Sequence, residues 1–130
     1  MVNYDEMSDL EVVTEVAKHL DLLVMSEDGP RYNYEYREKY PSTIWVAKHR
    51  HGKQTEPWEQ FNCVKCPNDA WSVIVENKID VSHTVTGDVN CAVFKPDVRG
   101  LYREFYSTTD KNPLRAAMIC FLKLMDATND

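Results

Sequence analysis

The stretch Asn112-Pro113-Leu114-Arg115-Ala116-Ala117-Met118 decides the fold, together with a second stretch of the same kind, Cys66-Pro67-Asn68-Asp69-Ala70-Trp71. In each, a proline follows a small polar residue or a cysteine and precedes a compact apolar segment. Proline is favoured at the first position of a helix, because its φ is already helical and its missing N–H would have no partner there. The two stretches therefore predict helices that begin at Pro67 and Pro113.

Apolar spacing gives the extent of both helices. After Asn112, which can cap the last helix, a buried stripe is predicted to run to about Asp126. The stripe consists of Leu114, Ala117, Met118, Phe121, Leu122 and Met125. The other helix is predicted to end near Asn77. Its inner face is expected to hold Ala70, Trp71, Ile74 and Val75.

A further helix is predicted near the N-terminus. Ser8-Asp9-Leu10-Glu11 has the form of a capping box, in which the serine accepts from a first-turn N–H and the glutamate reaches back. Apolar residues then recur at helical spacing as far as Leu20. The sequence therefore predicts a helix from about Asp9 to Leu20.

Alternating apolar residues on both sides of Thr86-Gly87-Asp88 predict a β-hairpin. The alternating set is Ile79, Val81, His83 and Val85 before the turn, and Val89, Cys91 and Val93 after it. A third strand is predicted over residues 101–106. Shorter strands are expected at about 22–25 and 43–48.

Residues at about 26–60 are predicted to be an irregular excursion rich in basic and aromatic residues, interrupted by Pro41, Gly52 and Pro57. Within it, Tyr32, Tyr34 and Tyr36 alternate as strand residues do. The whole chain, residues 1–130, is expected to be a single α+β domain. In it, a small antiparallel sheet of three or four strands packs with three amphipathic helices.

Charge is unevenly distributed along the chain, whose net charge is −6. Residues 1–30 hold eight acids and one lysine, whereas residues 31–53 hold six bases and two acids. The acidic total argues against general coating of DNA, because phosphate is repelled. No apolar run approaches the roughly 20 residues that a membrane span needs, and the acidic N-terminus does not resemble a signal peptide. A cytoplasmic protein without a membrane partner is therefore expected.

The two proline-initiated helices carry a family resemblance. Residues 67–77 and 112–122, with the opening helix at 8–17, resemble the NinX-like bacteriophage proteins, a family of small phage domains without an assigned activity. The resemblance covers the first helix and most of residues 61–125, but no part of residues 26–60. It implies a phage or prophage origin, the cytoplasm of the infected bacterium and an accessory role. It also implies a layout like that of related phage α/β/α sandwich domains, and it brings no catalytic residues.

One constellation has metal-binding potential. Cys63 and Cys66 have the spacing of a zinc-ligand pair, and His49 and His51 precede them on what is expected to be a strand. Zinc would then order the loop between them. The competing interpretation is that the cysteines are ordinary reduced thiols, with Cys66 simply preceding a helix-starting proline. No other cofactor is expected.

A second candidate site is the basic-aromatic segment. Aromatic rings interleaved with basic side chains suit a nucleotide or single-stranded nucleic acid. The residues expected to bind are Arg31, Tyr34, Arg37, Lys48 and Arg50. The alternative is a surface segment with solvated charges.

No nucleophile-base arrangement and no glycine-rich phosphate loop is recognisable, so an enzyme is not expected. The first interpretation is a phage accessory protein that binds a host macromolecule, most simply a host protein, without catalysis. The acidic first helix would contribute Asp9, Glu11 and Glu15, beside the excursion. A nucleic-acid or nucleotide-binding module, ordered by zinc, is the alternative. A third interpretation is a small-molecule pocket between the sheet and the Trp71 helix. Nothing in the sequence indicates the oligomeric state.

Overall fold

The computed structural model describes residues 3–26, 29, 33–96 and 102–128. Its helices are η1 (Tyr4–Glu6, a 3-10 turn), α1 (Asp9–His19), α2 (Tyr34–Lys39), α3 (Pro67–Glu76) and α4 (Pro113–Thr128). Its strands are β1 (Leu23–Val24), β2 (Ile44–Ala47), β3 (His49–Arg50), β4 (Lys53–Gln54), β5 (Glu59–Phe61), β6 (Asp80–His83), β7 (Val89–Pro96) and β8 (Tyr102–Asp110). This content confirms the predicted α+β class.

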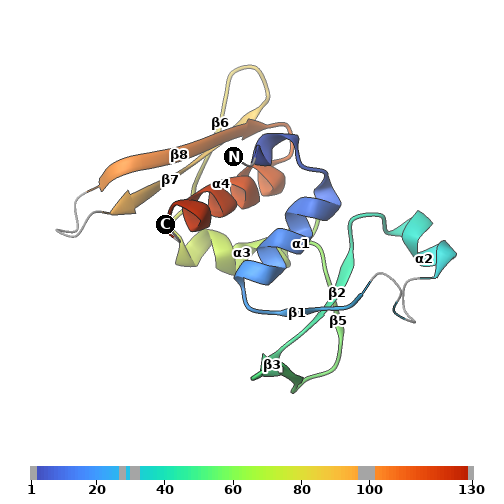
Figure 1. Cartoon of the computed structure of the whole chain (residues 1–130). Helices are drawn as coiled ribbons and strands as arrows, with labels where there is room; N and C mark the ends of the chain where they lie inside the picture. Colours follow the sequence, from blue (N-terminus) through green and yellow to red (C-terminus); the bar gives the residue numbers. More distant parts are fainter. Residues whose placement is uncertain (1–2, 27–28, 30–32, 97–101, 129–130) are drawn as a thin grey trace.

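Helix α4 lies at the centre of the molecule. The antiparallel sheet β6-β7-β8 packs on one side of it, and α1 and α3 pack on the other (Figure 1). Every side chain from Ala116 to Leu122 is buried. A helix that is apolar all round belongs inside a core rather than at a surface, so α4 is buried more completely than a single stripe would require.

A second antiparallel sheet, of order β1-β2-β5, packs against α1 and leads into the hairpin β3–β4. Its register pairs Val24 with Val46 and Ile44 with Phe61. Ile44, Val46 and Phe61 turn into the common core. Within the described residues the strands form three small sheets rather than the one that was expected, because the excursion supplies strands of its own.

The excursion is more ordered than predicted. The alternation of Tyr34 and Tyr36 does not mark a strand, because Tyr34–Lys39 form helix α2. Asn33 accepts a hydrogen bond from the backbone N–H of Tyr36 at 2.8 Å and so caps this helix. Tyr32 lies outside the described residues. Strands β2 to β5 follow α2 in the described part of the chain.

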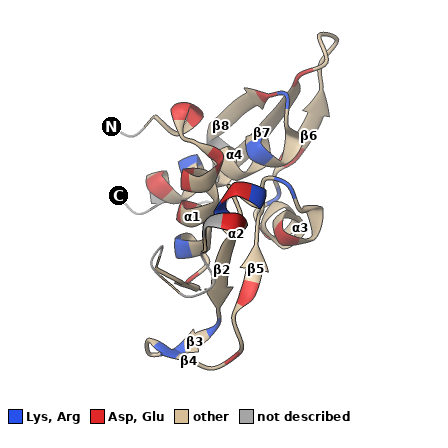
Figure 2. Ribbon diagram, turned by 90° about the vertical axis from the view of Figure 1, so that its right-hand side faces the viewer, with Lys and Arg blue, Asp and Glu red and all other residues tan. Residues whose placement is uncertain are grey.

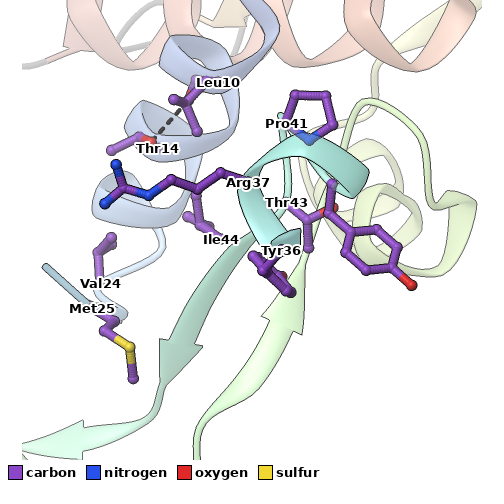
Figure 3. A pocket seen from close by; sticks show the side chains of 10 residues that line it. Leu10, Thr14, Val24, Met25, Tyr36, Arg37, Pro41, Thr43 and Ile44 are labelled. Carbon is purple, nitrogen blue, oxygen red and sulfur yellow. Dashed lines mark hydrogen bonds between the residues drawn. The ribbon is translucent and has the colours of Figure 1, made fainter. Parts of the chain in front are cut away.

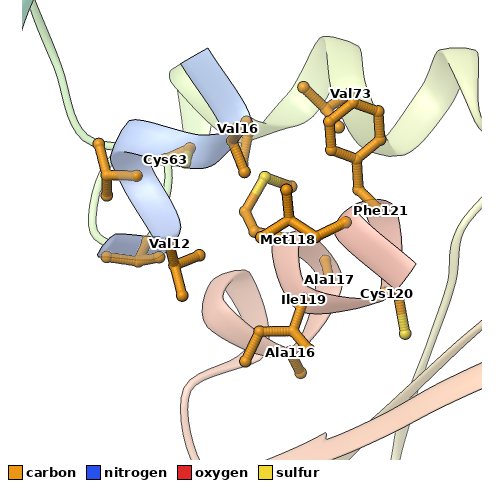
Figure 4. Packing of buried hydrophobic residues seen from close by; sticks show 14 of the residues in the cluster. Val12, Val16, Cys63, Val73, Ala116, Ala117, Met118, Ile119, Cys120 and Phe121 are labelled. Atoms are coloured by element: carbon orange, nitrogen blue, oxygen red, sulfur yellow. The ribbon is translucent and has the colours of Figure 1, made fainter. Parts of the chain in front are cut away.

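The core joins side chains that are far apart in sequence. Figure 4 shows Val12 and Val16 of α1 and Val73 of α3 gathered around Met118 and Phe121 of α4. The predicted inner face of α3 is wrong at Trp71. Its buried residues are Ala70 and Val73, whereas the side chain of Trp71 is 66% exposed.

Two asparagines connect the elements around the loop between β5 and α3. The Asn62 side chain donates to Ser42 Oγ at 3.0 Å and accepts from the backbone N–H of Val64. Asn112 accepts from the first N–H groups of α4 and donates from Nδ2 to the carbonyl oxygen of Val64 at 2.8 Å. The predicted cap of α4 is therefore confirmed, and it also anchors the loop that leads into α3.

The capping box at Ser8 and Glu11 is also confirmed. In the described part of the chain, no helix is both long enough and apolar enough to cross a bilayer.

Candidate functional site

A cavity of about 360 Å³ lies where α1 faces α2. We call it the α1–α2 cavity. It combines the first helix with the basic-aromatic excursion, the two regions that the sequence indicated as binding surfaces. Its lining is Leu10, Thr14, Val24, Met25, Tyr36, Arg37, Tyr40, Pro41, Thr43 and Ile44 (Figure 3). The cavity is therefore mainly apolar, with a few polar groups.

Aromatic rings form the α2 side of this cavity. The ring centroids of Tyr36 and Tyr40 lie 5.1 Å apart, and those of Tyr36 and Trp45 lie 5.8 Å apart. These separations are typical of attractive, tilted aromatic pairs. Because Trp45 belongs to β2, the rings attach the short helix α2 to the sheet.

Arg37 is the only charged residue among the described residues that line the α1–α2 cavity. Its side chain extends from α2 toward α1 and Thr14 (Figure 3). A guanidinium carries five N–H donors in a planar fork, which matches a carboxylate or a phosphate. The cavity therefore combines an apolar body with one cationic group.

The other expected basic residues lie elsewhere. Lys48 precedes the hairpin β3–β4, and Arg50 is within it. Figure 2 shows this hairpin at one end of the molecule, beyond β2 and β5. Lys48 is 3.8 Å from Glu56, in an exposed ion pair. Arg31 lies outside the described residues, and for Tyr34 only the backbone is described. The structure thus places Arg37 and Arg50 on different elements rather than in one patch.

The acids of the first helix each have a partner inside the protein. Asp9 accepts from Arg115 Nη1 at 2.8 Å, and Glu11 closes the capping box with Ser8. Glu15 lies 3.4 Å from Lys18 in an exposed pair. These contacts give the acids structural roles, and Asp9 and Glu15 are each paired with a basic side chain of the same chain.

The histidines of the expected zinc site also have structural roles. His49 Nδ1 accepts from the backbone N–H of Gly52 at 3.0 Å, and its Nε2 lies 3.1 Å from Asp21 Oδ1. The acceptor role of Nδ1 assigns the proton to Nε2, which donates to Asp21. His51 has a φ of 55° and forms the hairpin turn with Gly52, whose φ is 83°. This His-Gly pair, a two-residue turn signal, is the sequence feature from which β3–β4 was predictable.

The cysteines of that site lie near each other in the chain but differ in environment. Cys63 is fully buried in the core, and burial raises the pKa of its thiol to about 12. Cys66 is half-buried at the start of α3. The two thiols of the expected zinc pair therefore differ in exposure, because Cys63 is enclosed by the core and Cys66 is not. Among the described residues, no group of three or more His, Cys, Asp or Glu side chains is arranged to hold a metal ion.

The remaining thiols, Cys91 and Cys120, lie between α4 and the sheet β6-β7-β8, which we call the main sheet. Cys120 Sγ donates to the carbonyl oxygen of Cys91 at 3.0 Å. Burial raises the pKa of Cys91 to about 12 and also raises the pKa of Cys120. Neither thiol is therefore activated as a nucleophile.

A second cavity, of about 330 Å³, lies between α3 and the strands β2 and β5. Asn68, Asp69 and Ser72 line it from the helix, and Val46 and Phe61 from the strands. The sequence suggested a pocket between a sheet and the Trp71 helix, and this cavity has that location, although against the sheet that the excursion forms.

The outer face of α3 is a surface that sequence reasoning assigned to the core. Trp71 is 66% exposed and Val75, one turn later, is 53% exposed. Helix α3 carries two acids, Asp69 and Glu76, and no lysine or arginine. The sequence pattern did not identify which face of α3 is buried, because apolar residues occur on more than half of the circumference of this helix.

One family model, described as Bacteriophage P22, NinX, matches residues 3–125. The match includes residues 26–60, for which the sequence resemblance found no counterpart. Comparisons with curated proteins and with solved structures found no match.

Proposed function

The chain belongs to the bacteriophage P22 NinX family, and from this premise we propose that it is a phage accessory protein that binds a host protein without catalysing a reaction. We place its action in the cytoplasm of the infected bacterium, where phage accessory proteins meet host machinery. Burial raises the pKa of the Cys63 and Cys91 thiols to about 12 and also raises that of Cys120, so none of these three thiols is an activated nucleophile.

The observation that carries this proposal is the exposed pair Trp71 and Val75 on α3. Tryptophan is enriched among the residues that dominate the binding energy of protein interfaces. An exposed tryptophan with an apolar neighbour one helical turn away forms a small anchor that a partner groove can bury. Core packing does not require Trp71, because Ala70 and Val73 already attach α3 to α4 and its surroundings.

Charge favours a protein partner over a nucleic acid at this face. Asp69 and Glu76 are the charged residues of α3, and the chain as a whole is acidic. Phosphate groups would be repelled there. A host surface with an apolar groove and a basic rim matches both the tryptophan and the acids.

The test compares tagged wild-type protein with Trp71→Ala as baits in an extract of the bacterial host. The captured protein is then purified and its affinity is measured directly. Trp71→Ala is expected to weaken binding about 30-fold or more, as for a strong interface residue. Ser72→Ala, at an exposed neighbouring position, is the matched control and should leave the affinity unchanged.

Two results would contradict the proposal. One is equal affinity of wild type and Trp71→Ala for the identified partner. The other is concentration-dependent self-association in sedimentation that Trp71→Ala abolishes, because the face would then belong to an interface between copies of the chain.

A second candidate function is nucleic-acid binding at the hairpin β3–β4. Arg50 and Lys53 are direct cross-strand partners, and both are exposed. Like charges placed directly opposite each other destabilise a strand pair, so a bound phosphate would relieve this repulsion. Lys48 lies immediately before the hairpin.

This candidate is tested by fluorescence anisotropy with a labelled single-stranded oligonucleotide at low and high salt. Arg50→Gln with Lys53→Gln should remove the binding, whereas Lys18→Gln, on α1, should not. Absence of binding at low salt would exclude this function.

A further inference from the structure

We propose that the second cavity, between α3 and the strands β2 and β5, receives an arginine side chain of the host protein that binds the Trp71 face. The inference rests on the proposed function, because it names the chemistry of the same partner. Three features of the cavity carry it: the position next to Trp71, the apolar floor and the acidic rim.

The second cavity lies beside the proposed anchor on α3. Asn68, Trp71 and Val75 follow one another at helical spacing, so their side chains share one face of the helix. All three residues are exposed, and Asn68 also lines the cavity. A partner that buries Trp71 therefore covers the adjoining cavity as well.

The floor of this cavity is apolar and already ordered. It consists of Leu20, Leu22, Val46 and Phe61. Val46 and Phe61 belong to the hydrophobic core, and the two leucines pack against it. A wall that is already ordered loses little conformational entropy when a ligand binds. At about 330 Å³, the cavity is at the small end of the roughly 300–1,000 Å³ of ligand sites, which suits one long side chain.

Glu59 lies at the solvent-facing end of this floor. It pairs with Val46 across the strands and precedes Phe61 by two residues. Cross-strand partners and residues two apart lie on the same face of a sheet, so Glu59 shares the face of Val46 and Phe61, although it is exposed. Within the described part of the chain, no hydrogen bond or ion pair engages its carboxylate. The apolar floor therefore ends in an available carboxylate.

The charge of the lining selects a cation. Its charged members are Lys48, Glu56, Glu59 and Asp69, all of which the structure describes. Lys48 and Glu56 form an exposed ion pair at 3.8 Å, which leaves the two other carboxylates. Asp69 Oδ2 accepts from the backbone N–H of Asn62 at 2.9 Å, and this contact orients the carboxylate. Because a carboxylate accepts on both oxygens, Asp69 can take a further donor.

An arginine side chain combines the two properties that this lining favours. Its aliphatic stem packs on apolar surface while its charged head stays near water. Its guanidinium is planar, weakly hydrated and able to donate two parallel hydrogen bonds to one carboxylate. In the second cavity the stem would lie on Val46 and Phe61, and the guanidinium would lie at Glu59 and Asp69.

The test titrates the ¹⁵N-labelled full chain with the peptide acetyl-Ala-Ala-Arg-Ala-Ala-amide. The control peptide has citrulline in place of arginine, which keeps the shape of the side chain but removes its charge. Saturable amide shifts are expected at Glu59, Phe61 and Asn68 with the arginine peptide. The citrulline peptide should bind at least about tenfold more weakly, because a charged hydrogen-bonding group is lost.

Two variants test the named residues. Glu59→Gln should weaken binding of the arginine peptide about tenfold and leave the weak binding of the citrulline peptide unchanged. Asn68→Trp, at an exposed position that lines the cavity, should fill the cavity and weaken the binding of both peptides. Glu38→Gln, at an exposed position on α2 outside the lining, is the matched charge control and should have no effect.

The inference is overturned if neither peptide binds, if both bind equally, or if Glu59→Gln leaves the affinity for the arginine peptide unchanged. Shifts confined to Leu10, Thr14 and Ile44 would also overturn it, because they would place the peptide in the α1–α2 cavity.

The captured host protein separates this inference from the proposed function. The expected result is that both Trp71→Ala and Glu59→Gln weaken its binding, the latter about tenfold. Binding that depends on Trp71 but not on Glu59 would overturn the inference alone. Binding that depends on neither residue, with the arginine peptide still held in the cavity, would overturn the proposed function, while the cavity would remain an arginine site.

Discussion

The chemistry of single residues in this protein follows from burial more than from residue type. Cys63 and Cys66 occur in a motif that is typical of metal sites, but Cys63 is enclosed by the core. Burial disfavours the charged thiolate and raises the pKa of Cys63 to about 12. The spacing of the two cysteines was visible in the sequence, whereas the unequal environments of the two thiols were not.

This difference predicts the reactivity of the thiols toward Ellman's reagent at pH 8 in the native protein. Because the thiolate is the reactive form, the half-buried Cys66 should react first, and Cys63, Cys91 and Cys120 only on unfolding. The rapid phase should disappear in Cys66→Ser and persist in Cys63→Ser.

Zinc content measured on the same samples gives an independent control. About one zinc per chain, lost in both Cys63→Ser and His49→Ala, would contradict the predicted order of reactivity. It would mean that residues 49–66 can adopt an arrangement in which Cys63 is a ligand.

At the scale of elements, two helices are capped by asparagines that differ in their surroundings. Asn112 caps the buried helix α4 and also donates to Val64, in the loop before α3. Asn33 caps α2, which has six residues and lies at the surface beside the α1–α2 cavity. The same residue type thus caps a helix at the centre of the fold in one place and a surface helix in the other.

The two caps are predicted to differ in their effect on stability. Asn112→Ala should lower the free energy of unfolding by about 2 kcal/mol, because a cap and a half-buried hydrogen bond are both lost. Asn33→Ala should cost about 0.5 kcal/mol, the lower limit for a cap, since α2 contributes little to the core. Urea unfolding of both variants measures the difference.

Local readouts separate the two effects further. In Asn33→Ala, amide exchange should increase at residues 36–40 and stay unchanged in α4. Equal destabilisation by the two substitutions would show that α2 is a cooperative part of the core, contrary to this prediction.

At the scale of the whole molecule, Arg115 connects the N-terminal segment to the centre. Its guanidinium donates to Asp9 of α1 at 2.8 Å, to Asp110 of β8 at 3.1 Å and to the backbone carbonyl of Met7. The side chain is only 13% exposed. One residue therefore joins the main sheet, α4, α1 and the segment that precedes α1.

Arg115→Gln is predicted to lower the free energy of unfolding by about 2–3 kcal/mol. Removing one member of a largely buried ion pair leaves its partners without compensation, and the partial exposure of Asp9 limits the loss. Thermal and urea unfolding give the value. Lys18→Gln, which removes an exposed pair with Glu15, should change stability by less than about 0.5 kcal/mol. A similarly small effect of Arg115→Gln would contradict the connecting role.

The predictable part of this protein was the part encoded by local signals. Proline after a capping residue, the capping box at Ser8 and the turn at Thr86-Gly87-Asp88 each act over a few residues, and the structure confirms α1, α3, α4 and the hairpin β6–β7. The family resemblance rested on the same helices and was confirmed over residues 3–125. Local signals also predicted the class of the fold, because the order of elements follows from them.

The candidate sites depended on contacts between distant residues, which no local pattern contains. Helix α3 has apolar residues around much of its circumference, and only the position of α4 decides that Ala70 is buried and Trp71 exposed. The α1–α2 cavity exists because the aromatic stack with Trp45 places α2 opposite α1. By itself the sequence determined the class, the main helices and the family, since capping and turn formation are short-range. Only the tertiary structure decided which side chains face solvent, because burial depends on the whole set of packed elements.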